Sequence, residues 1–444
     1  MSDTISSAVA NESRLSSLRP DMGEIKGWKI INYVFASIAF LVTFFIYALT
    51  SQPTVSFWDC GEFISCSYLL AVPHPPGAPL VLLFGRLVSL LPLGVEVAQK
   101  INWMSSLLNA IAVGIIFLIL SRVIRNWFGK IKNGMEAFIT VIGALTGAFF
   151  AGLGTTYWNN GLEAEVYGFA MVFTVLVIYL AILWSEHHEN PVADRYIVLS
   201  AYLLYLGMFT HMTVLIMLPP LFLFYIIVDK QKRLNPIFWL TWFVLFLVAT
   251  EFNIFVENFF TALIIFALAS IITNNKAGKS LFLLITGFWA LVQLFLITKG
   301  TTIPGILFKQ YGLSGTAPNL VGSIFQFLIL TAAFIIVLMK NYIREWRIGF
   351  LTIFLALIAF SLNSYTLIRS RADPYIDEND PETIQSLRNY MDRKQYGQES
   401  LWKLMFNIDI IPILQSLQEQ LLLFRSSHLP YISILFLLPQ KIQS

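Results

Sequence analysis

Charged residues are scarce in this sequence, and so are cysteines and the motifs of nucleotide or zinc chemistry. Asp, Glu, Lys and Arg make up 12% of the 444 residues, against roughly 25% in a soluble domain. Cys60 and Cys66 are the only cysteines, too few for a disulfide framework, although one bridge between them can form if their loop faces an oxidising compartment. No Walker A run, dinucleotide-binding fingerprint, HExxH or paired CxxC occurs, so ATP-driven transport and zinc hydrolysis have no motif here.

Apolar residues make up 57% of the chain, and the mean hydropathy is +0.71. The polar segment 1–27 lacks the short apolar core and the small-residue cleavage site of a secretory signal. The apolar run that begins at Trp28 and ends at Leu49 is long enough to cross a bilayer, for which about 20 residues are needed. We therefore predict a cytoplasmic tail over 1–27, followed by an uncleaved signal anchor.

The rest of the chain repeats this pattern of apolar runs and short polar breaks. It predicts an all-α, polytopic transmembrane helix bundle over 28–368, with some of the shorter spans tilted or shielded by protein. The eleven expected spans are 28–50, 98–121, 136–157, 163–184, 196–211, 213–228, 236–256, 257–273, 280–298, 320–340 and 348–368.

Lysines and arginines mark the two sides of the membrane, because short loops rich in both stay cytoplasmic. The opposite loops before residue 369 contain only four basic residues, Arg86, Lys100, Lys299 and Lys309. The basic positions fall before span one and after even-numbered spans: Arg14, Arg19, Lys26, Lys29, Arg122, Arg125, Lys130, Lys132, Arg195, Lys230, Lys232, Arg233, Lys276, Lys279, Lys340, Arg344 and Arg347. This distribution predicts a cytoplasmic N-terminus, an external first loop and an external segment from 369 onward.

Residues 78–93 look like a further span, but they are short for a crossing and carry Arg86 in their middle. A crossing there would also move the Arg122–Lys132 cluster to the outside. We therefore expect an interfacial or re-entrant helix, within a long external loop that covers 51–97.

Two carboxylates, Asp59 and Glu62, lie in that loop beside the first span. Desolvating a charge costs several kcal/mol or more unless it is paired or used. A helix that begins at Asp59 places both acids on one face, where their repulsion raises the pKa of one. This arrangement suits a general base and its partner. The structural alternative makes Asp59 an N-cap and Glu62 its capping-box partner.

Several segments resemble a bacterial multi-pass family related to the animal transmembrane protein O-mannosyltransferases, within the GT-C glycosyltransferase superfamily. The matching segments are PTVSFWDCGEF at 53–63, HPPGAPL at 74–80, EAEVY at 163–167, Thr210-His211, and 371–382 with 395–397. The resemblance covers roughly 28–400. It implies a GT-C-like plan: a cytoplasmic N-terminus, a long first external loop with an acidic motif, and 8–14 spans.

The resemblance also implies a reaction. GT-C enzymes commonly pass a sugar from a polyprenyl phosphate to an acceptor hydroxyl, which needs a general base, while the leaving phosphate needs cationic or amide donors. The expected enzyme is inverting and metal-independent, with no cofactor and Asp59 and Glu62 as catalytic residues. The expected substrate-binding residues are His74, Glu163, Glu165, His211, Arg369 and Arg371.

A mannose-like donor and a protein or glycan acceptor, foremost Ser/Thr of an exported protein, are family-level expectations. So is a place in the bacterial inner membrane with the site on the external, periplasmic face. The basic loops indicate topology and anionic lipid, and no nucleic-acid partner is expected. The alternatives are a transporter or flippase of lipid-linked saccharide, for which Glu251 and Glu257 are the only intramembrane charges, and a scaffold subunit.

Each substrate-binding residue has a structural alternative. His74 can be a loop hydrogen-bonder, His211 an interfacial histidine, and one of Glu163 and Glu165 a charge at a helix N-terminus. Arg369 and Arg371 can be snorkelling anchors, although their planar donors suit phosphate.

The C-terminal part contains an acidic run and an unmatched tail. The run from Asp373 to Glu382 does not have EF-hand spacing. Asp380 as N-cap and Pro381 as the first helical residue instead predict a helix over 381–394. We expect an external helical segment over 369–400. The 401–444 tail resembles nothing in the family, and we expect a truncated domain or interfacial amphipathic helices there.

Overall fold

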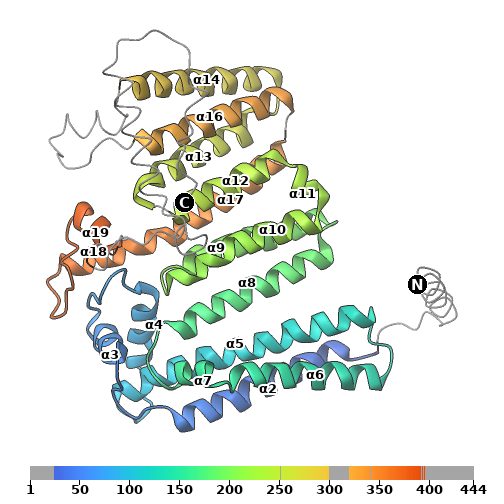
Figure 1. Cartoon of the computed structure of the whole chain (residues 1–444), viewed down its shortest axis with the longest axis vertical. Coiled ribbons are helices and arrows are strands. Elements are labelled where there is room, and N and C mark those ends of the chain that lie inside the picture. Colours follow the sequence, from blue (N-terminus) through green and yellow to red (C-terminus); the bar gives the residue numbers. More distant parts are fainter. Residues whose placement is uncertain are drawn as a thin grey trace, which may run out of the picture. The chain divides into compact units, whose positions relative to one another are not determined.

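The computed structural model describes residues 25–250, 252–299, 320–340, 342–391, 393 and 395, without the side chains of 252–255. Expectations for most of the N-terminal tail, for Glu251 and for the 401–444 tail lie outside this part of the chain. The described residues are helical apart from loops and one isolated bridge between Val72 and Asp377. The predicted all-α class is confirmed (Figure 1).

Seven segments are long and apolar enough to cross a membrane, and all seven coincide with predicted spans. Their positions confirm a polytopic helical bundle. They are α2 (Trp28–Thr50), α5 (Val97–Phe128), α6 (Gly134–Gly152), α8 (Tyr167–His187), α14 (Lys276–Thr298), α16 (Leu320–Met339), and the Ile343–Ser370 segment of α17 (Ile343–Phe360) and α18 (Ser364–Ser370).

The other four predicted spans also coincide with helices. They are α9 (Asp194–Gly207), the 3₁₀ turn Met212–Met217 with α10 (Leu218–Val228), α12 (Pro236–Thr250) and α13 (Phe252–Ile272). The apolar segments described for α10, α12 and α13 are each shorter than 18 residues. Composition thus located eleven helical segments, and the number that cross the membrane stays a prediction.

Three of the short helices lie before α8. Helix α3 (Cys60–Leu69) and helix α4 (Pro79–Ser89) fill the first loop, and the stretch 78–93 contains the short helix α4. The third, α7 (Thr155–Leu162), was not predicted. The chain leaves the membrane-length helix α6 at Gly152, earlier than the 136–157 span requires, and forms α7 before α8.

The described chain divides into two compact units, the first made of 25–232 with 355–395 and the second of 233–354. In the first unit α2 packs on α5 and α6, and α5 also packs on α7 and α8. Small residues permit this close approach, as is typical of membrane helices. A Cβ on Gly114 of α5 would lie 3.3 Å from the Phe40 Cβ of α2. The buried core there consists of Ala36, Ala39, Val113, Phe117, Ala144 and Ala148.

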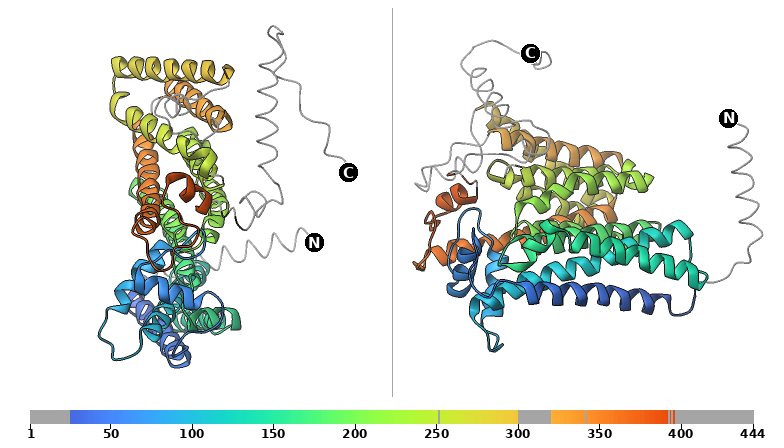
Figure 2. Two further views of the ribbon diagram at one scale, coloured as in Figure 1. Left: turned by 90° about the vertical axis from the view of Figure 1, so that its left-hand side faces the viewer. Right: turned by 60° about the horizontal axis from the view of Figure 1, so that its bottom comes forward.

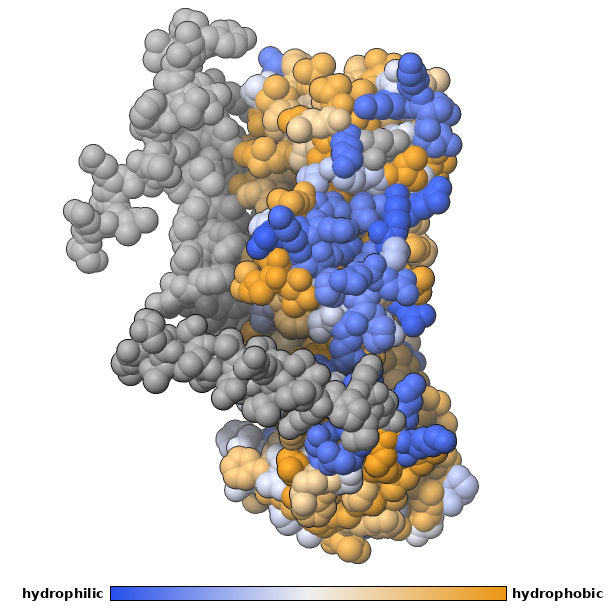
Figure 3. Space-filling view, turned by 90° about the vertical axis from the view of Figure 1, so that its right-hand side faces the viewer, coloured by the Kyte–Doolittle hydropathy of each residue, from blue (hydrophilic) through white to orange (hydrophobic). Residues whose placement is uncertain are grey.

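The ends of the first unit differ in what they carry. Helices α3 and α4 lie at one end beside α18 and α19 (Ile384–Met391), as two further views show (Figure 2). The opposite end, where α5 and α8 finish, faces the viewer in Figure 3, in which hydrophilic residues gather between hydrophobic flanks. Hydrophilic residues thus gather on the face at which these helices end.

Candidate functional site

Helix α3 presents the two predicted acids at its first turn. Asp59 is its N-cap residue and Glu62 lies in its first turn, so both share one end of the helix as predicted. The Asp59 side chain makes no capping hydrogen bond, and this structure therefore does not show the capping alternative. Cys60 and Cys66 of the same helix are buried free thiols, so the optional bridge between them is not formed.

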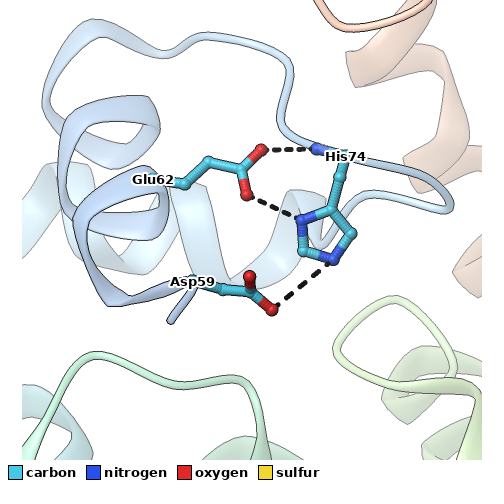
Figure 4. A group of neighbouring side chains, drawn as sticks. All are labelled: Asp59, Glu62 and His74. Carbon is cyan, nitrogen blue, oxygen red and sulfur yellow. Dashed lines mark hydrogen bonds and ion pairs between the residues drawn. The ribbon is translucent and has the colours of Figure 1, made fainter. Parts of the chain in front are cut away.

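The His74 imidazole lies between the two carboxylates (Figure 4). Its Nδ1 is 2.7 Å from Glu62 Oε2, and its main-chain N–H donates to Glu62 Oε1 over 2.6 Å. Its Nε2 is 4.0 Å from Asp59 Oδ2. Glu62 is therefore held twice by one residue, while the Asp59 side chain, 55% exposed, is open to a substrate.

Burial and pairing act against each other on the pKa values of this pair. Desolvation raises the pKa of Glu62, but the hydrogen bonds from His74 outweigh it and the net shift is downward. The hydrogen bond to Glu62 raises the pKa of His74, against the opposing effect of burial, and the Asp59 charge adds to the rise. An imidazolium bound to a carboxylate is thus favoured, with Asp59 on the open side of the ring.

The 371–391 segment holds the His74 loop in place. Val72 N–H donates to the Ile376 carbonyl over 3.0 Å, and Glu378 N–H donates to the Val72 carbonyl over 3.1 Å. The buried Tyr390 hydroxyl of α19 donates to the Pro73 carbonyl. Two segments that sequence reasoning singled out separately therefore form one structure. Sequence reasoning missed Tyr390, whose only signal was its position on the predicted helix.

Gly77 is required where α19 meets this loop. Its φ is +71°, in the left-handed region that favours glycine. A Cβ there would lie 2.7 Å from the Tyr390 hydroxyl.

The predicted helix 381–394 begins later, at Ile384, because Thr383 caps it: Ser386 N–H donates to Thr383 Oγ1 over 3.0 Å. The expected N-cap role of Asp380 is therefore wrong.

Arg369 and Arg371 are both brought to this end of the first unit, and both bind main-chain carbonyls. Arg369 donates to the carbonyls of Leu69 and Leu70, where α3 ends. Arg371 donates to the Glu382 carbonyl over 2.7 Å. Each arginine thus ties a part of the 369–391 segment to its surroundings. These bonds use only some of the five N–H donors of a guanidinium group.

The predicted acids Glu163 and Glu165 lie in the short loop between α7 and α8. Glu163 accepts a hydrogen bond from Ser56 of the first loop, which joins the two acidic segments. Glu165 is buried, and desolvation, followed by the charge of Asp59, raises its pKa to about 7. Burial thus favours the protonated form of Glu165, which can donate a proton or a hydrogen bond.

His211 lies at the turn between α9 and α10. Its ring nitrogen accepts from Thr213 N–H at 3.3 Å, and its ring lies 5.0 Å from that of Tyr167. Burial, then the charges of Arg393 and His74, lowers its pKa. His211 thus caps a turn, and it also belongs to the electrostatic surroundings of His74.

The three central side chains are also a group that can hold a metal. One ligand atom from each of Asp59, Glu62 and His74 lies within 4.8 Å of the others. Carboxylate and imidazole donors suit several divalent ions. However, His74 Nδ1 is engaged by Glu62, so a metal at that nitrogen has to replace this bond.

Part of this chain, including most of the candidate site residues, matches a known protein family. The family described as the protein O-mannosyl-transferase TMEM260 N-terminal domain matches residues 59–235. A Dictyostelium discoideum protein O-mannosyl-transferase tmem260 is 28% identical over 211 residues, covering 45% of this chain and 24% of that protein. The mouse protein O-mannosyl-transferase TMEM260 is 26% identical over 212 residues, covering 47% and 27%.

The chain therefore spans about a quarter of the length of these curated relatives. No solved structure matches it. The matched region begins at Asp59 and contains Glu62, His74, Glu163, Glu165 and His211, while Arg369 and Arg371 lie beyond it. Residues 59–235 of this chain are therefore similar to the N-terminal domain of the protein O-mannosyl-transferases named TMEM260.

Proposed function

We propose that this protein is a membrane glycosyltransferase of the GT-C type that transfers a mannose-like sugar from a polyprenyl-phosphate donor to an acceptor hydroxyl. One observation carries the choice of residues: His74 holds Glu62 twice, whereas the Asp59 carboxylate is more than half exposed 4.0 Å from the His74 ring. Asp59 is then the base and Glu62 the residue that orients His74.

In the proposed step, the acceptor oxygen attacks C1 of the sugar on the face opposite the phosphate. The C1–O bond to the phosphate breaks, polyprenyl phosphate leaves, and the hydroxyl proton passes to the Asp59 carboxylate. This single displacement inverts the configuration at C1. A positioned base typically contributes about 10²–10⁴-fold to such a step. The His74 imidazolium, held by Glu62, stabilises the charge of Asp59 before the proton arrives.

The donor phosphate needs cationic partners, and Arg369 and Arg371 lie at this end of the first unit with His211. We propose that the guanidinium N–H groups not used on carbonyls bind the phosphate, with His211 as a neutral donor. Glu163 and Glu165 then contact the sugar or the acceptor. Ser or Thr of an exported protein is the proposed acceptor, since the relatives carry the name protein O-mannosyl-transferase.

The proposed location is a bacterial inner membrane, with a cytoplasmic N-terminus and the site on the external face. The support is the distribution of basic residues in the loops. The site lies at the end of the first unit opposite the finish of α5 and α8, where Arg122, Arg125, Lys130 and Lys132 lie. A lipid-linked donor anchored in the external leaflet can reach this end without leaving the membrane.

The test is transfer of labelled sugar from polyprenyl-phosphate mannose to proteins of a crude envelope extract by the purified chain. We expect Asp59→Asn to lower turnover by about 100-fold or more with little change in stability, because Asn is close to Asp in size but is not a base, and the exposed Asp59 side chain makes no capping hydrogen bond. The same assay with EDTA should run at the wild-type rate if the reaction is metal-independent.

Glu96→Gln is the matched control, since Glu96 is an exposed N-cap acid of the same loop whose side chain makes no capping bond. Near-wild-type transfer by Asp59→Asn would remove Asp59 as the base and direct the test to Glu62. Absence of transfer by the wild-type chain would overturn the proposed function itself.

A further inference from the structure

Helix α5 carries a row of polar side chains where a membrane helix is expected to be apolar. Asn102, Ser105, Ser106 and Asn109 are each at most 2% exposed. Their spacing of three, four and seven residues places them on one face of the helix. Polar groups buried in a membrane protein are costly unless they are hydrogen-bonded, so this face requires partners.

The partners are main-chain groups of the segment that carries Glu163 and Glu165. Asn109 Nδ2 donates to the Asn160 carbonyl over 2.9 Å, and Ser106 Oγ donates to the Gly161 carbonyl over 2.7 Å. Asn102 Oδ1 accepts from Ala164 N–H over 2.9 Å. Ser105 Oγ accepts from Glu165 N–H over 3.3 Å. Asn109 and Ser106 therefore bind the end of α7, whereas Asn102 and Ser105 bind the acidic loop after it.

Asn102 differs from the other three because it also binds the first external loop. Its Nδ2 donates to the carbonyls of Gln52 and Thr54, over 2.8 Å and 3.0 Å. Its Oδ1 lies 3.7 Å from the Sγ of Cys60, the residue after Asp59. Both amide hydrogens and both acceptor sites of the side chain are thus used.

We propose that Asn102 is a positioning residue, which sets the distance between Asp59 and the Glu163–Glu165 loop by binding the main chain on both sides. The proposal rests on the proposed function, since it assigns these carboxylates to one site. It goes beyond the sequence motifs, because Asn102 lies in an apolar span and belongs to none of them.

The side chain chemistry explains why asparagine is needed. Alanine removes all four contacts. Aspartate keeps the acceptor for Ala164 N–H and Cys60 Sγ but loses both donors to the Gln52 and Thr54 carbonyls. A displacement of about 1 Å between reacting groups can lower a rate about 10²-fold. A loss of these ties should therefore lower turnover more than it alters donor affinity.

The experiment compares Asn102→Ala and Asn102→Asp with Asn109→Ala. Asn109 is the matched control: it is the same residue type, on the same face of α5 and equally buried, but its amide binds only the Ser105 and Asn160 carbonyls. The first readout is independent of activity. Cys60 is fully buried beside Asn102, so its rate of maleimide labelling in a Cys66→Ala background reports whether the first loop has separated from α5.

We expect Asn102→Ala to raise the Cys60 labelling rate at least about 10-fold and to lower kcat about 10- to 100-fold, with the donor KM within about threefold of wild type. Asn102→Asp should change both quantities in the same direction by at least as much, because the Gln52 and Thr54 carbonyl oxygens repel a buried carboxylate. Asn109→Ala should leave both near wild type, even if its thermal stability falls as much.

Three results overturn the proposal: unchanged Cys60 labelling in both Asn102 variants, unchanged kcat in well-folded variants, or equal effects from Asn109→Ala. Should Asn102→Ala fail to fold, Asn102→Asp alone decides. A wild-type chain that transfers no sugar refutes the proposed function, whereas the labelling rates still decide whether Asn102 joins the two segments.

Discussion

Buried polar side chains serve different purposes in the two units of this protein. In the first unit, at the ends of the helices, they bind main-chain groups of loops and ionisable residues gather beside them. In the second unit one group of them forms side-chain hydrogen bonds between helices. Gln293 Nε2 of α14 donates to Gln326 Oε1 of α16 over 2.7 Å, and Gln326 Nε2 donates to Thr261 Oγ1 of α13.

The second network contains no charge, and its three side chains are at least nine-tenths buried. Such side-chain bonds between membrane helices stabilise association modestly, by about 0.6 kcal/mol on average. They join neutral side chains of neighbouring helices. The first unit uses its bonds to hold loops, and its carboxylates stay available. The comparison teaches that a polar residue in a membrane protein points to function when it orders irregular backbone beside a titratable group.

Among the variants that test this difference between the units, Glu62→Gln should have the largest effect on turnover. Glutamine can still accept from the His74 main-chain N–H, but it is neutral and loses the ion pair with the ring. His74 is then free to turn away from Asp59. We expect turnover to fall about 10-fold, less than for Asp59→Asn, because the base remains. Assays of labelled sugar transfer measure this, and a fall as large as that of Asp59→Asn would exchange the two roles.

The second expected effect is a pH dependence of stability that originates in the first unit. The raised pKa of His74 stabilises the fold fully below its ordinary value of 6.5, and this contribution is lost as pH rises through the raised value. The lowered pKa of Glu62 contributes above 4.5, and its contribution is lost as pH falls through the lowered value. The pair therefore stabilises the protein most between pH 4.5 and 6.5, and its contribution falls outside this range towards the two folded pKa values.

Thermal unfolding of the detergent-solubilised protein between pH 3 and 9 should show this window. Glu165 acts in the same sense as His74 and opposite to Glu62, because its pKa is raised to about 7: its contribution to stability is full below 4.5 and is lost as pH rises through about 7. His74→Gln should remove the loss of stability that the pair shows above pH 6.5, and Glu165→Gln should remove the loss between pH 4.5 and about 7. A wild-type profile retained by both variants would contradict these assignments.

The smallest expected effect comes from Gln326→Leu in the second unit. It removes both bonds of the network and leaves the buried Gln293 amide without its acceptor, a change that costs about 1–3 kcal/mol. We therefore expect the unfolding free energy to fall by about 1–3 kcal/mol, with sugar transfer within about twofold of wild type. A loss of transfer comparable to that of Glu62→Gln would mean that the second unit takes part in the reaction.

Much of the site was predictable because charge is rare in this sequence. Asp59 and Glu62 were found as acids beside a span, and α3 begins where their spacing required. Periodicity, however, cannot show which carboxylate a distant side chain engages. His74 holds Glu62 from twelve residues away, and sequence reasoning could not choose between the two acids.

Tertiary contacts also explain the predictions that were wrong or missing. Thr383 caps α19 in place of Asp380, because local capping signals compete and packing on the His74 loop selects one. Helix α7 forms because the polar face of α5 binds its last carbonyls. Neither effect leaves a signal in a hydropathy profile.

The sequence by itself determined the class of the protein, the positions of its helices and the identity of the exposed acids, because the cost of burying charge and unpaired backbone in lipid leaves few alternatives. Only the tertiary structure decided which groups meet. It brought Tyr390 to the Pro73 carbonyl and placed Asn102 between Gln52 and Ala164. Such contacts join segments far apart in the chain, and their energy depends on geometry that neither composition nor spacing encodes.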